Sequence, residues 1–325
     1  MSDTTRPKRY RMVSKFYKET YGEKVYKLPV ALPLTCPNRD GSAGVGGCTF
    51  CGEIGAGYEN RPAWMTVRMQ LEENIAHIGP KYKAKKFIPY YQNFSNTYLP
   101  LEDFKSYIEQ GCIDEAVGIA IATRPDCISN EYLDVLQDIQ QRFHKDIYIE
   151  LGLQTVNYHT LEKINRGHDL AQFIDAVLRI KRYGFNVTTH MIVNLPWDTM
   201  EDTIEGAKIL SSLGVDQVKL HALYIVKHTL MAKWYEEGQI TLISAEEYAE
   251  RVVQFLRHLH PDIVLQRLVG RAPEDNTLFT NWSMGWWRVQ DLIDDMMDDL
   301  DAHQGDLCDY LNGKAVRKFI DGGQA

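Results

Sequence analysis

Runs of apolar residues alternate with amphipathic stretches along most of the chain. Six apolar runs have the length and composition of strands, at residues 25–34, 87–93, 116–123, 147–154, 186–195 and 215–226. Between them, apolar residues recur at helical spacing, as at Val67, Leu71, Ile75 and Ile78. This alternation favours a parallel sheet wound with helices over an all-α or an all-β fold.

Several polar residues stand where helices would begin. Ser129 and Thr199 occupy expected N-cap positions, and Ser244 with Glu247 forms a capping-box pattern that opens helical material after the sixth unit. Near the carboxyl end, residues 291–307 are acidic but keep apolar residues at helical spacing. We expect a surface helix with a solvated acidic face there.

Composition limits the setting of the protein. The 325 residues are expected to form one domain with extensions, and the net charge of −8 means that the protein as a whole repels polyanions. A nucleic-acid site would therefore need a local basic patch, and residues 6–11 ("RPKRYR") and 81–86 ("KYKAKK") are the candidates. The chain starts without an apolar signal core and has no membrane-spanning run, so we expect a cytoplasmic protein.

Polar residues recur at the ends of the predicted strands. In a parallel barrel the carboxyl ends of the strands converge on one mouth, so this distribution predicts a ligand pocket. The alternative is that each polar side chain is satisfied locally. The residues concerned are Gln92, Asn93, Arg124, Glu150, Gln154, His190, Asn194, Lys219 and His221.

Three cysteines lie close together after the first predicted strand. Cys36, Cys48 and Cys51 have the spacing Cys-x11-Cys-x2-Cys, and no second Cys-x2-Cys pair follows to complete a zinc ribbon. A redox pair would not need the third cysteine. A four-iron cluster bound by three thiolates would leave one iron open to a substrate or cofactor, which makes the missing fourth ligand the functional feature.

The set of motifs around these cysteines resembles the radical S-adenosylmethionine (SAM) enzymes. Within that superfamily the sequence is most similar to the YhcC-type family, which itself resembles the radical SAM domain of the Elongator catalytic subunit. The likeness covers residues 36–229 and leaves the last part of the chain largely outside it. It is carried by "CPNRDG", "GGCTFC", "TRPDC" at 123–127, "ELGLQT" at 150–155, "INRGHD" at 164–169 and "VKLHALYIVKHT" at 218–229.

The resemblance implies a fold and two cofactors. The expected fold is a partial (βα)6 TIM-like barrel over residues 1–235, followed by a mainly helical C-terminal extension over residues 236–325. The cofactors are a 4Fe-4S cluster, bound by Cys36, Cys48 and Cys51, and SAM on its open iron. A reductant such as flavodoxin or ferredoxin would supply the electron that cleaves SAM to a 5′-deoxyadenosyl radical.

The resemblance also implies roles for the strand-end residues. Glu150 and Gln154 correspond to positions that reach the ribose or methionine part of SAM, and His190 and Asn194 belong to the stretch that lines the adenine. Many members carry Gly-Gly-Glu after the second strand to bind the SAM amine. This chain has "YYQNFSNTY" there, so Gln92, Asn93 and Ser95 are the nearest candidates.

The catalytic set facing the substrate is expected to be Arg124, Lys219 and His221. An arginine can bind a phosphate or carboxylate through two hydrogen bonds, and lysine and histidine can bind the same groups. For each of them the alternative is a structural ion pair inside the barrel.

Three functions follow, in order of preference. The first is a tRNA-modifying enzyme that converts the carboxymethylaminomethyl group of wobble uridine to aminomethyl, because the YhcC-type family is associated with that remodelling. The second is a radical SAM enzyme acting on a small metabolite or a protein side chain, which suits the negative net charge. The third is a non-catalytic metal-binding module.

Overall fold

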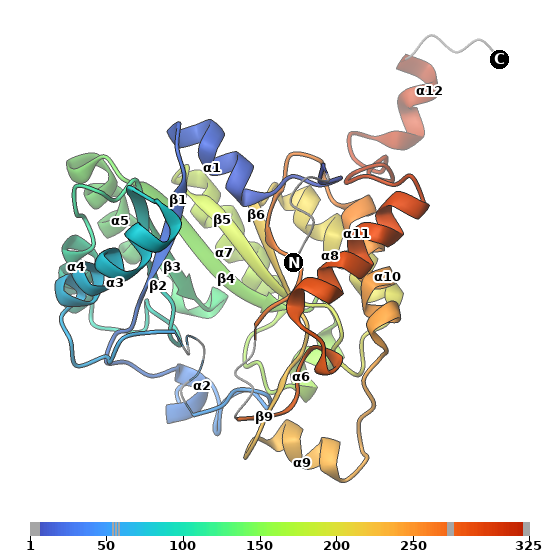
Figure 1. Ribbon diagram of the computed structural model, residues 1–325, viewed down its shortest axis with the longest axis horizontal. Helices are drawn as coiled ribbons and strands as arrows, with labels where there is room; N and C mark the ends of the chain where they lie inside the picture. Colours follow the sequence, from blue (N-terminus) through green and yellow to red (C-terminus); the bar gives the residue numbers. More distant parts are fainter. Residues whose placement is uncertain (1–6, 54, 56, 58, 272–275, 321–325) are drawn as a thin grey trace.

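The centre of the protein is a curled, seven-stranded parallel sheet (Figure 1). The computed structural model describes residues 7–53, 55, 57, 59–271 and 276–320. Each strand pairs with the next in parallel, in the order β1 (Val25–Val30), β2 (Lys86–Tyr91), β3 (Gly118–Thr123), β4 (Asp146–Gln154), β5 (Asn186–Ile192), β6 (Gln217–His221) and β8 (Val264–Arg267). The expected parallel, barrel-like α/β fold is confirmed, with one strand more than the sequence pattern predicted.

Two short strands lie outside this sheet. The apolar run 215–226, predicted as one strand, divides into β6 and the short β7 (Ile225–Val226). β7 pairs in antiparallel fashion with β9 (Thr277–Phe279). The chain therefore turns away from the sheet immediately after His221.

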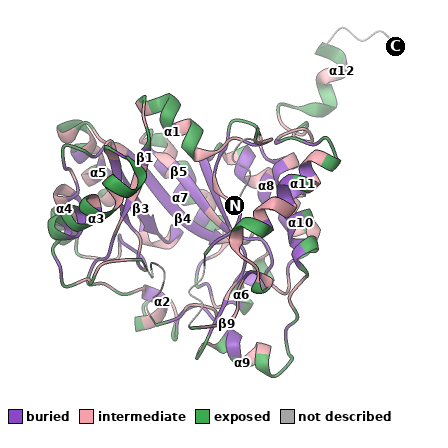
Figure 2. Ribbon diagram, in the orientation of Figure 1, coloured by how far each residue is buried: buried purple, intermediate pink, exposed green. Residues whose placement is uncertain are grey.

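Helices flank the sheet, and the strands between them are largely buried (Figure 2). The helix starts at Thr199 and at Ser244 with Glu247 are confirmed as capping boxes, and Ser129 is also an N-cap, although its side chain makes no capping hydrogen bond. The main apolar core lies between the helices and the outer face of the sheet. The helices are α1 (Val13–Tyr21), α2 (Pro37–Asp40), α3 (Val67–Tyr82), α4 (Leu101–Gln110), α5 (Asn130–Phe143), α6 (Tyr158–Lys163), α7 (Leu170–Arg182), α8 (Met200–Leu213), α9 (Leu230–Glu236), α10 (Ala245–His258), α11 (Trp286–Asp299) and α12 (Arg317–Ile320).

Helix α1 closes the amino-terminal end of the incomplete barrel. It packs against both edge strands, β1 and β8. Tyr17 on α1 is buried with Tyr90 and Tyr148, which come from the inner faces of β2 and β4. α1 thus covers this end of the barrel interior with aromatic side chains.

The last third of the chain is part of the same body. β8, which lies in the expected helical extension, completes the sheet next to β6, so the sheet continues across residue 235. The segment before α1 runs beside β8, where the backbone N–H of Leu265 donates to the carbonyl of Arg11 at 2.8 Å. The segment before α1 and strand β8 therefore lie side by side at one edge of the barrel.

Ion pairs occupy the basic run at residues 6–11. Arg6 lies outside the described residues, while Lys8 pairs with Asp294 and Arg9 pairs with Asp298 on α11. Asp294 is buried and also accepts a hydrogen bond from the hydroxyl of Tyr10 at 2.9 Å. The acidic face of α11 is therefore partly a docking surface for the N-terminal segment, where we had expected full solvation.

The second basic run, 81–86, lies at the end of α3 and the start of β2. This is the amino edge of the parallel sheet, opposite the strand ends that carry the predicted site. Tyr82 stacks on Tyr26 with ring centroids 4.6 Å apart, and Lys24 lies over the Tyr26 ring. Within the described part of the chain, no helix has both the length and the apolar character needed to cross a bilayer.

Candidate active site

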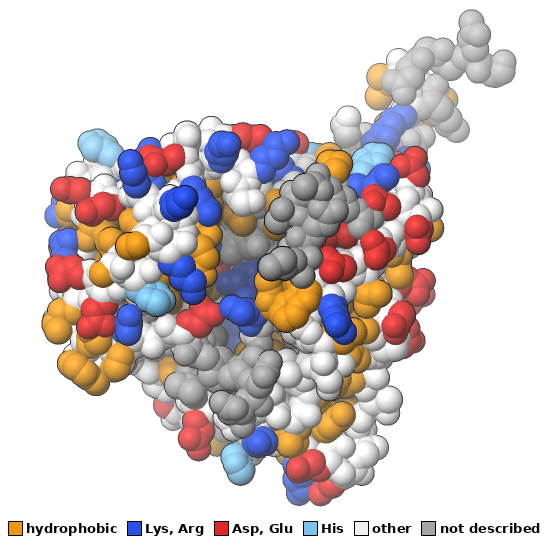
Figure 3. Space-filling model, in the orientation of Figure 1, with side chains coloured by type: hydrophobic (Ala, Val, Ile, Leu, Met, Phe, Trp, Pro, Cys, Tyr) orange, Lys and Arg blue, Asp and Glu red, His pale blue; other side chains and the backbone are white. Residues whose placement is uncertain are grey.

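A pocket of about 530 Å³ opens at the carboxyl ends of the strands. Figure 3 shows it as a hollow in the face of the molecule, with Lys and Arg side chains visible inside. Cys36, Cys48 and Cys51 line it together with residues from β2, β3, β4, β5, β6 and β8. Most of the strand-end residues and the cysteine triad therefore share one cavity.

The cysteine loop is held against later parts of the chain by its backbone. The N–H of Thr49 donates to the carbonyl of Ile164 at 3.0 Å, and the N–H of Met231 donates to the carbonyl of Thr49 at 2.9 Å. The amide of Asn38 reaches both Cys48 and the carbonyl of Asn165. These bonds fix the loop between α6 and α9, because its own elements are too short to do so.

Each of the three sulfurs has a hydrogen-bond donor, and two of the donors come from outside the cysteine loop. Arg166 Nη1 lies 3.4 Å from Cys48 Sγ, Arg39 Nη2 lies 3.3 Å from Cys51 Sγ, and Ser95 Oγ lies 3.9 Å from Cys36 Sγ. All three cysteines are free of disulfides. Burial raises the pKa of the Cys51 thiol, whereas the Arg39 guanidinium favours its thiolate. Donors of this kind stabilise sulfur that carries negative charge, as metal-bound thiolate does.

The three sulfurs do not converge on one point. No group of three or more His, Cys, Asp or Glu side chains among the described residues is arranged to hold a single metal ion. In an iron–sulfur cluster each thiolate binds a different iron, so the ligands surround the cluster and stay apart from one another. Three separate thiolates at these positions are compatible with a cluster.

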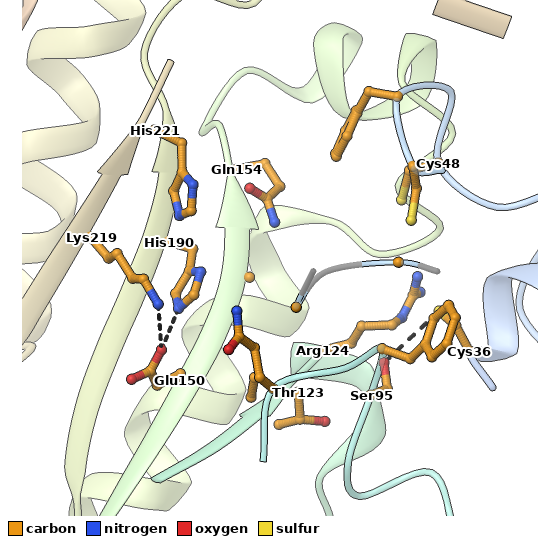
Figure 4. Close-up of a pocket in the computed structure, with 18 of the residues that line it drawn as sticks. Cys36, Cys48, Ser95, Thr123, Arg124, Glu150, Gln154, His190, Lys219 and His221 are labelled. Atoms are coloured by element: carbon orange, nitrogen blue, oxygen red, sulfur yellow. Dashed lines mark hydrogen bonds and ion pairs between the residues drawn. The ribbon is translucent and has the colours of Figure 1, made fainter. Parts of the chain in front are cut away.

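A second group of side chains surrounds the buried carboxylate of Glu150, on the opposite side of the pocket (Figure 4). Its Oε2 contacts His190 Nε2 at 2.7 Å and Lys219 Nζ at 3.4 Å. Its Oε1 accepts hydrogen bonds from Lys27 and, at 3.3 Å, from Gln266. Because Lys27 is on β1 and Gln266 on β8, this network joins the two edges of the open barrel.

Burial and the cations set the ionisation of this group. Burial alone would raise the pKa of the Glu150 carboxyl, but Lys219, Lys27 and His190 hold it well below its ordinary value. Burial lowers the pKa of Lys219 to about 7, with Arg267 and Lys27 adding to the effect and Glu150 opposing it. Burial likewise lowers the pKa of His190 to about 4. Glu150 is therefore ionised at neutral pH, and Lys219 titrates there.

The low pKa of Lys219 predicts a pH-dependent contribution to stability. The unfolded chain holds the lysine proton up to about pH 10.4, whereas the folded protein releases it near pH 7. Raising the pH between these values favours the state with fewer bound protons, so the folded state gains up to about 1.4 kcal/mol per pH unit. We expect the difference in unfolding free energy between the wild type and Lys219→Met to grow in favour of the wild type from pH 7.5 to 9. Chemical denaturation at each pH measures it, and a constant difference would contradict the shift.

The end of β4 is distorted where it meets the pocket. The pairing of β4 with β5 shifts register between Gly152 and Gln154, and Gln154 has a φ of 80°, which is rare for a residue other than glycine. A Cβ at Gly152 would lie 2.7 Å from Arg166 Nη2 and 2.8 Å from Gln154 Nε2. Gly152 thus lets Arg166 pass behind the strand to Cys48, while Gln154 projects into the pocket between the cysteines and His221 (Figure 4).

Most of the predicted site residues line this pocket, and two do not. The pocket contains Cys36, Cys48, Cys51, Gln92, Ser95, Arg124, Glu150, Gln154, His190, Lys219 and His221. Asn93 lies outside it, with its amide bonded to both backbone groups of Leu32. Asn194 also lies outside, and its Oδ1 accepts from the N–H of Leu223 at 2.6 Å. Both asparagines are used to shape loops at the mouth.

Two of the residues in the pocket are committed to partners within the protein. Arg124 is fully buried and forms two hydrogen bonds with Asp126, at 2.8 and 2.6 Å, and a third with the carbonyl of Arg166. This is the structural ion pair considered as its alternative role. Both oxygens of Glu150 are taken by side chains of the protein, so the carboxylate organises Lys219 and His190.

Sequence reasoning missed four cations of the site. Lys27 and Arg267 lie on β1 and β8, whereas Arg39 in α2 and Arg166 in the loop after α6 reach the sulfurs. Two signals were present in the sequence: a lysine in the middle of the apolar run "VYKLPV", and "INRGHD", which contains Arg166. The strand "VLQR" was overlooked because it is short and follows a long helix.

Comparison with known proteins identifies the family to which this chain belongs. The radical SAM superfamily profile matches residues 37–210, and the radical SAM C-terminal domain matches residues 215–299. YtqA of Bacillus subtilis is 34% identical over 95% of this chain and 96% of its own length. YhcC of Escherichia coli K12 is 33% identical over 82% of this chain and 85% of its own. The expected YhcC-type relationship is confirmed.

Weaker likenesses extend to the Elongator proteins. The solved structure of archaeal Elp3 from Methanocaldococcus infernus, with an N-terminal deletion, superposes with a TM-score of 0.66. It is 15% identical, over 86% of this chain and 64% of that one, and therefore shows the shared fold alone. The tRNA uridine(34) acetyltransferase of Dehalococcoides mccartyi is 25% identical over 43% of this chain and 30% of its own length.

Membership of this family also indicates which cofactors the protein uses. Radical SAM proteins use a 4Fe-4S cluster and SAM, and the matched profile begins beside Cys36 and covers the other two cysteines. The chain therefore belongs to the radical SAM superfamily and is a SAM-dependent iron–sulfur enzyme.

Proposed function

We propose that this enzyme acts on the wobble uridine of tRNA and converts its carboxymethylaminomethyl group to aminomethyl. The N–CH2 bond to the carboxymethyl group would break, SAM would serve as the oxidant, water would supply the oxygen, and the two carbons would leave as glyoxylate. The observation that carries the proposal is the division of the pocket into two sides. The three cysteines line one side, and His190, Lys219 and His221 line the other, with Gln154 between them (Figure 4). One side suits the cofactors, and the other leaves a polar, cationic space for a substrate.

The residues of the first side fit a cluster and SAM. Cys36, Cys48 and Cys51 are the proposed cluster ligands, because each free sulfur has a donor from Ser95, Arg166 or Arg39. Gln92, Ser95 and Gln154 are the proposed contacts for SAM, since they line the pocket from the loop after β2 and from β4. When bound and reduced, the cofactors would supply a radical able to abstract hydrogen.

The residues of the second side hold the substrate in this proposal. Lys219 and His221 at the end of β6 face the pocket and can donate hydrogen bonds to an anionic group. Glu150 fixes the Lys219 ammonium and the His190 ring, so it acts as a positioning residue. Arg124 has the same role in this proposal, because Asp126 and the Arg166 carbonyl occupy its guanidinium.

The choice of tRNA rests on similarity as well as geometry. The relatives include a tRNA uridine(34) acetyltransferase, although that likeness covers less than half of the chain. The second candidate substrate is a small metabolite or a protein side chain, and the position of the two basic runs favours it. The basic run at 7–11 is engaged with α11, and the run at 81–86 lies at the amino edge of the sheet, away from the mouth.

We further propose that a small acidic electron carrier, such as flavodoxin or ferredoxin, reduces the enzyme beside the cysteine loop. Cys48 and Cys51 also line a second cavity of about 900 Å³ on the loop's other side. Arg39, Lys163 and His228 line it as well. Positive charge beside the cysteines supports an acidic partner.

An anaerobic turnover experiment tests the proposed function. Reduced, iron-loaded enzyme is incubated with SAM and either a tRNA bearing carboxymethylaminomethyluridine or the unmodified transcript of the same tRNA. We expect the modified tRNA alone to stimulate 5′-deoxyadenosine formation and to gain aminomethyluridine, both measured by mass spectrometry.

The other outcomes separate the candidates. Formation of 5′-deoxyadenosine that no tRNA stimulates, with an unchanged nucleoside profile, would overturn the tRNA proposal and favour a smaller substrate. Binding of the modified tRNA should also weaken steeply with salt, because phosphate contacts release counterions.

A further inference from the structure

The side chain of Arg267 has an unusual position at the end of β8. It lines the pocket opposite the cysteines, beside His221 and Tyr224. Its Nη2 donates to His221 Nδ1 at 2.7 Å, while its Nε is buried without a hydrogen-bond partner among the described residues. No carboxylate of the described residues lies within 4 Å of this partly buried guanidinium, although arginines that lose contact with water are normally paired.

The charges on this side of the pocket do not balance. Lys27, Lys219 and Arg267 face a single buried carboxylate, Glu150, which is bonded to the two lysines and to His190. The other acidic side chain among the described residues that line the cavity is Glu59, which is exposed. The described residues thus leave a surplus of positive charge on the β6–β8 side. Burying such a surplus costs free energy unless a bound anion neutralises it.

His221 is held in a neutral form whose ring can donate one hydrogen bond to a ligand. Burial and the charge of Arg267 keep the pKa of His221 well below its ordinary value, so its ring is neutral. Since Arg267 donates to Nδ1, the proton of the neutral ring is on Nε2. The ring stacks on His190 with centroids 5.3 Å apart, which fixes its orientation.

The backbone behind Arg267 restricts its movement. A Cβ at Gly270 would lie 3.3 Å from Arg267 Nη2 and 3.6 Å from His221 Nδ1. The carbonyl of Gly270 is held by Asn281 Nδ2 at 3.0 Å. The guanidinium is therefore backed by main chain on one side and has the pocket on the other.

We propose that Arg267, together with Lys219 and His221, forms a subsite that binds a carboxylate of the substrate. The inference rests on the proposed function, since the carboxymethylaminomethyl group ends in a carboxylate and the aminomethyl product does not. The subsite then recognises the part of the substrate that is to be removed and distinguishes substrate from product.

Two tRNAs that differ only in charge provide the first test. One carries carboxymethylaminomethyluridine, and the other carries its neutral methyl ester. The wild type should process the carboxylate form about 10- to 100-fold better in kcat/KM, the range expected for a charge-assisted bidentate contact. Arg267→Gln should lose this preference, and Arg267→Lys should recover part of it. Lys15→Gln, which removes one charge from exposed α1, is the matched control.

The outcomes distinguish failure of the subsite from failure of the proposed function. Equal use of ester and carboxylate by the wild type would overturn the subsite while leaving the tRNA reaction intact. If no tRNA is a substrate, acetate and its neutral isostere acetamide are compared as probes at equal ionic strength. Acetate should raise the melting temperature of cofactor-loaded wild type more than acetamide does, and Arg267→Gln should abolish the difference. Equal shifts in the wild type would overturn the subsite.

Discussion

Cys48→Ala is expected to abolish cluster binding and SAM cleavage. Cys48 is the buried member of the triad, and both Arg166 and Asn38 direct donors at its sulfur. Removal of partners outside the ligand shell typically lowers metal affinity or activity by about 10- to 100-fold, so the loss of a ligand itself should exceed that range. Iron content, the visible absorption of the reconstituted protein and the yield of 5′-deoxyadenosine measure the effect.

A matched substitution shows whether the effect belongs to the site. Cys308→Ala removes another free cysteine, one that is not among the residues lining the pocket. It should keep the full iron content and turnover of the wild type. If Cys48→Ala retained four irons per chain and cleaved SAM at the wild-type rate, the proposed ligand set would be wrong.

Glu150→Gln is expected to cause the largest loss of stability among single substitutions at the pocket. The carboxylate is the common partner of Lys27, Lys219 and His190, and its removal leaves the partly buried Lys27 and the buried Lys219 without a counter-charge. Breaking a buried ion pair in this way costs about 3–5 kcal/mol. For a chain of this size, that corresponds to a fall in melting temperature of about 4–7 °C, which calorimetry of the cofactor-free protein measures.

A double-mutant cycle isolates the electrostatic part of that loss. Adding Lys219→Met to Glu150→Gln removes one of the side chains that lost its partner. The double variant should therefore be destabilised by about 1–2 kcal/mol less than the sum of the losses in the two single variants. Glu205→Gln, in an exposed ion pair on α8, should change the unfolding free energy by less than about 1 kcal/mol. Strict additivity at Glu150 and Lys219 would contradict the buried network.

The fold was predictable wherever a strand is long and buried. The runs that became β1 to β6 are apolar enough to be recognised, and Thr199 and Ser244 marked helix starts correctly. β8 was missed because four residues of mixed polarity carry too little periodic signal. Its position depends on tertiary contacts, with β6 on one side and the segment around Arg11 on the other.

The site was predictable where chemistry limits the residue types. The spacing of the three cysteines predicted a cluster site, and the polar residues at the strand ends predicted the pocket. The roles of Asn93, Asn194 and Arg124 could not be inferred from position, because a side chain at the mouth can face either the cavity or a neighbouring loop. Their hydrogen bonds to Leu32, Leu223 and Asp126 decide the matter, and such contacts are invisible in the sequence.

The docking of the cysteine loop has a consequence for how the protein is made. Thr49 is held by Ile164 and by Met231, so the loop cannot take its final shape until the ribosome has added the residues up to α9. At about 5–20 residues per second, the three thiols wait roughly 10–40 s between their own synthesis and that of Met231. During part of this interval Arg166, which donates to Cys48 in the folded protein, has not yet been synthesised. Iron delivery to this enzyme is therefore expected to follow completion of most of the barrel, and premature oxidation of the nascent chain would lead to disulfides in place of a cluster.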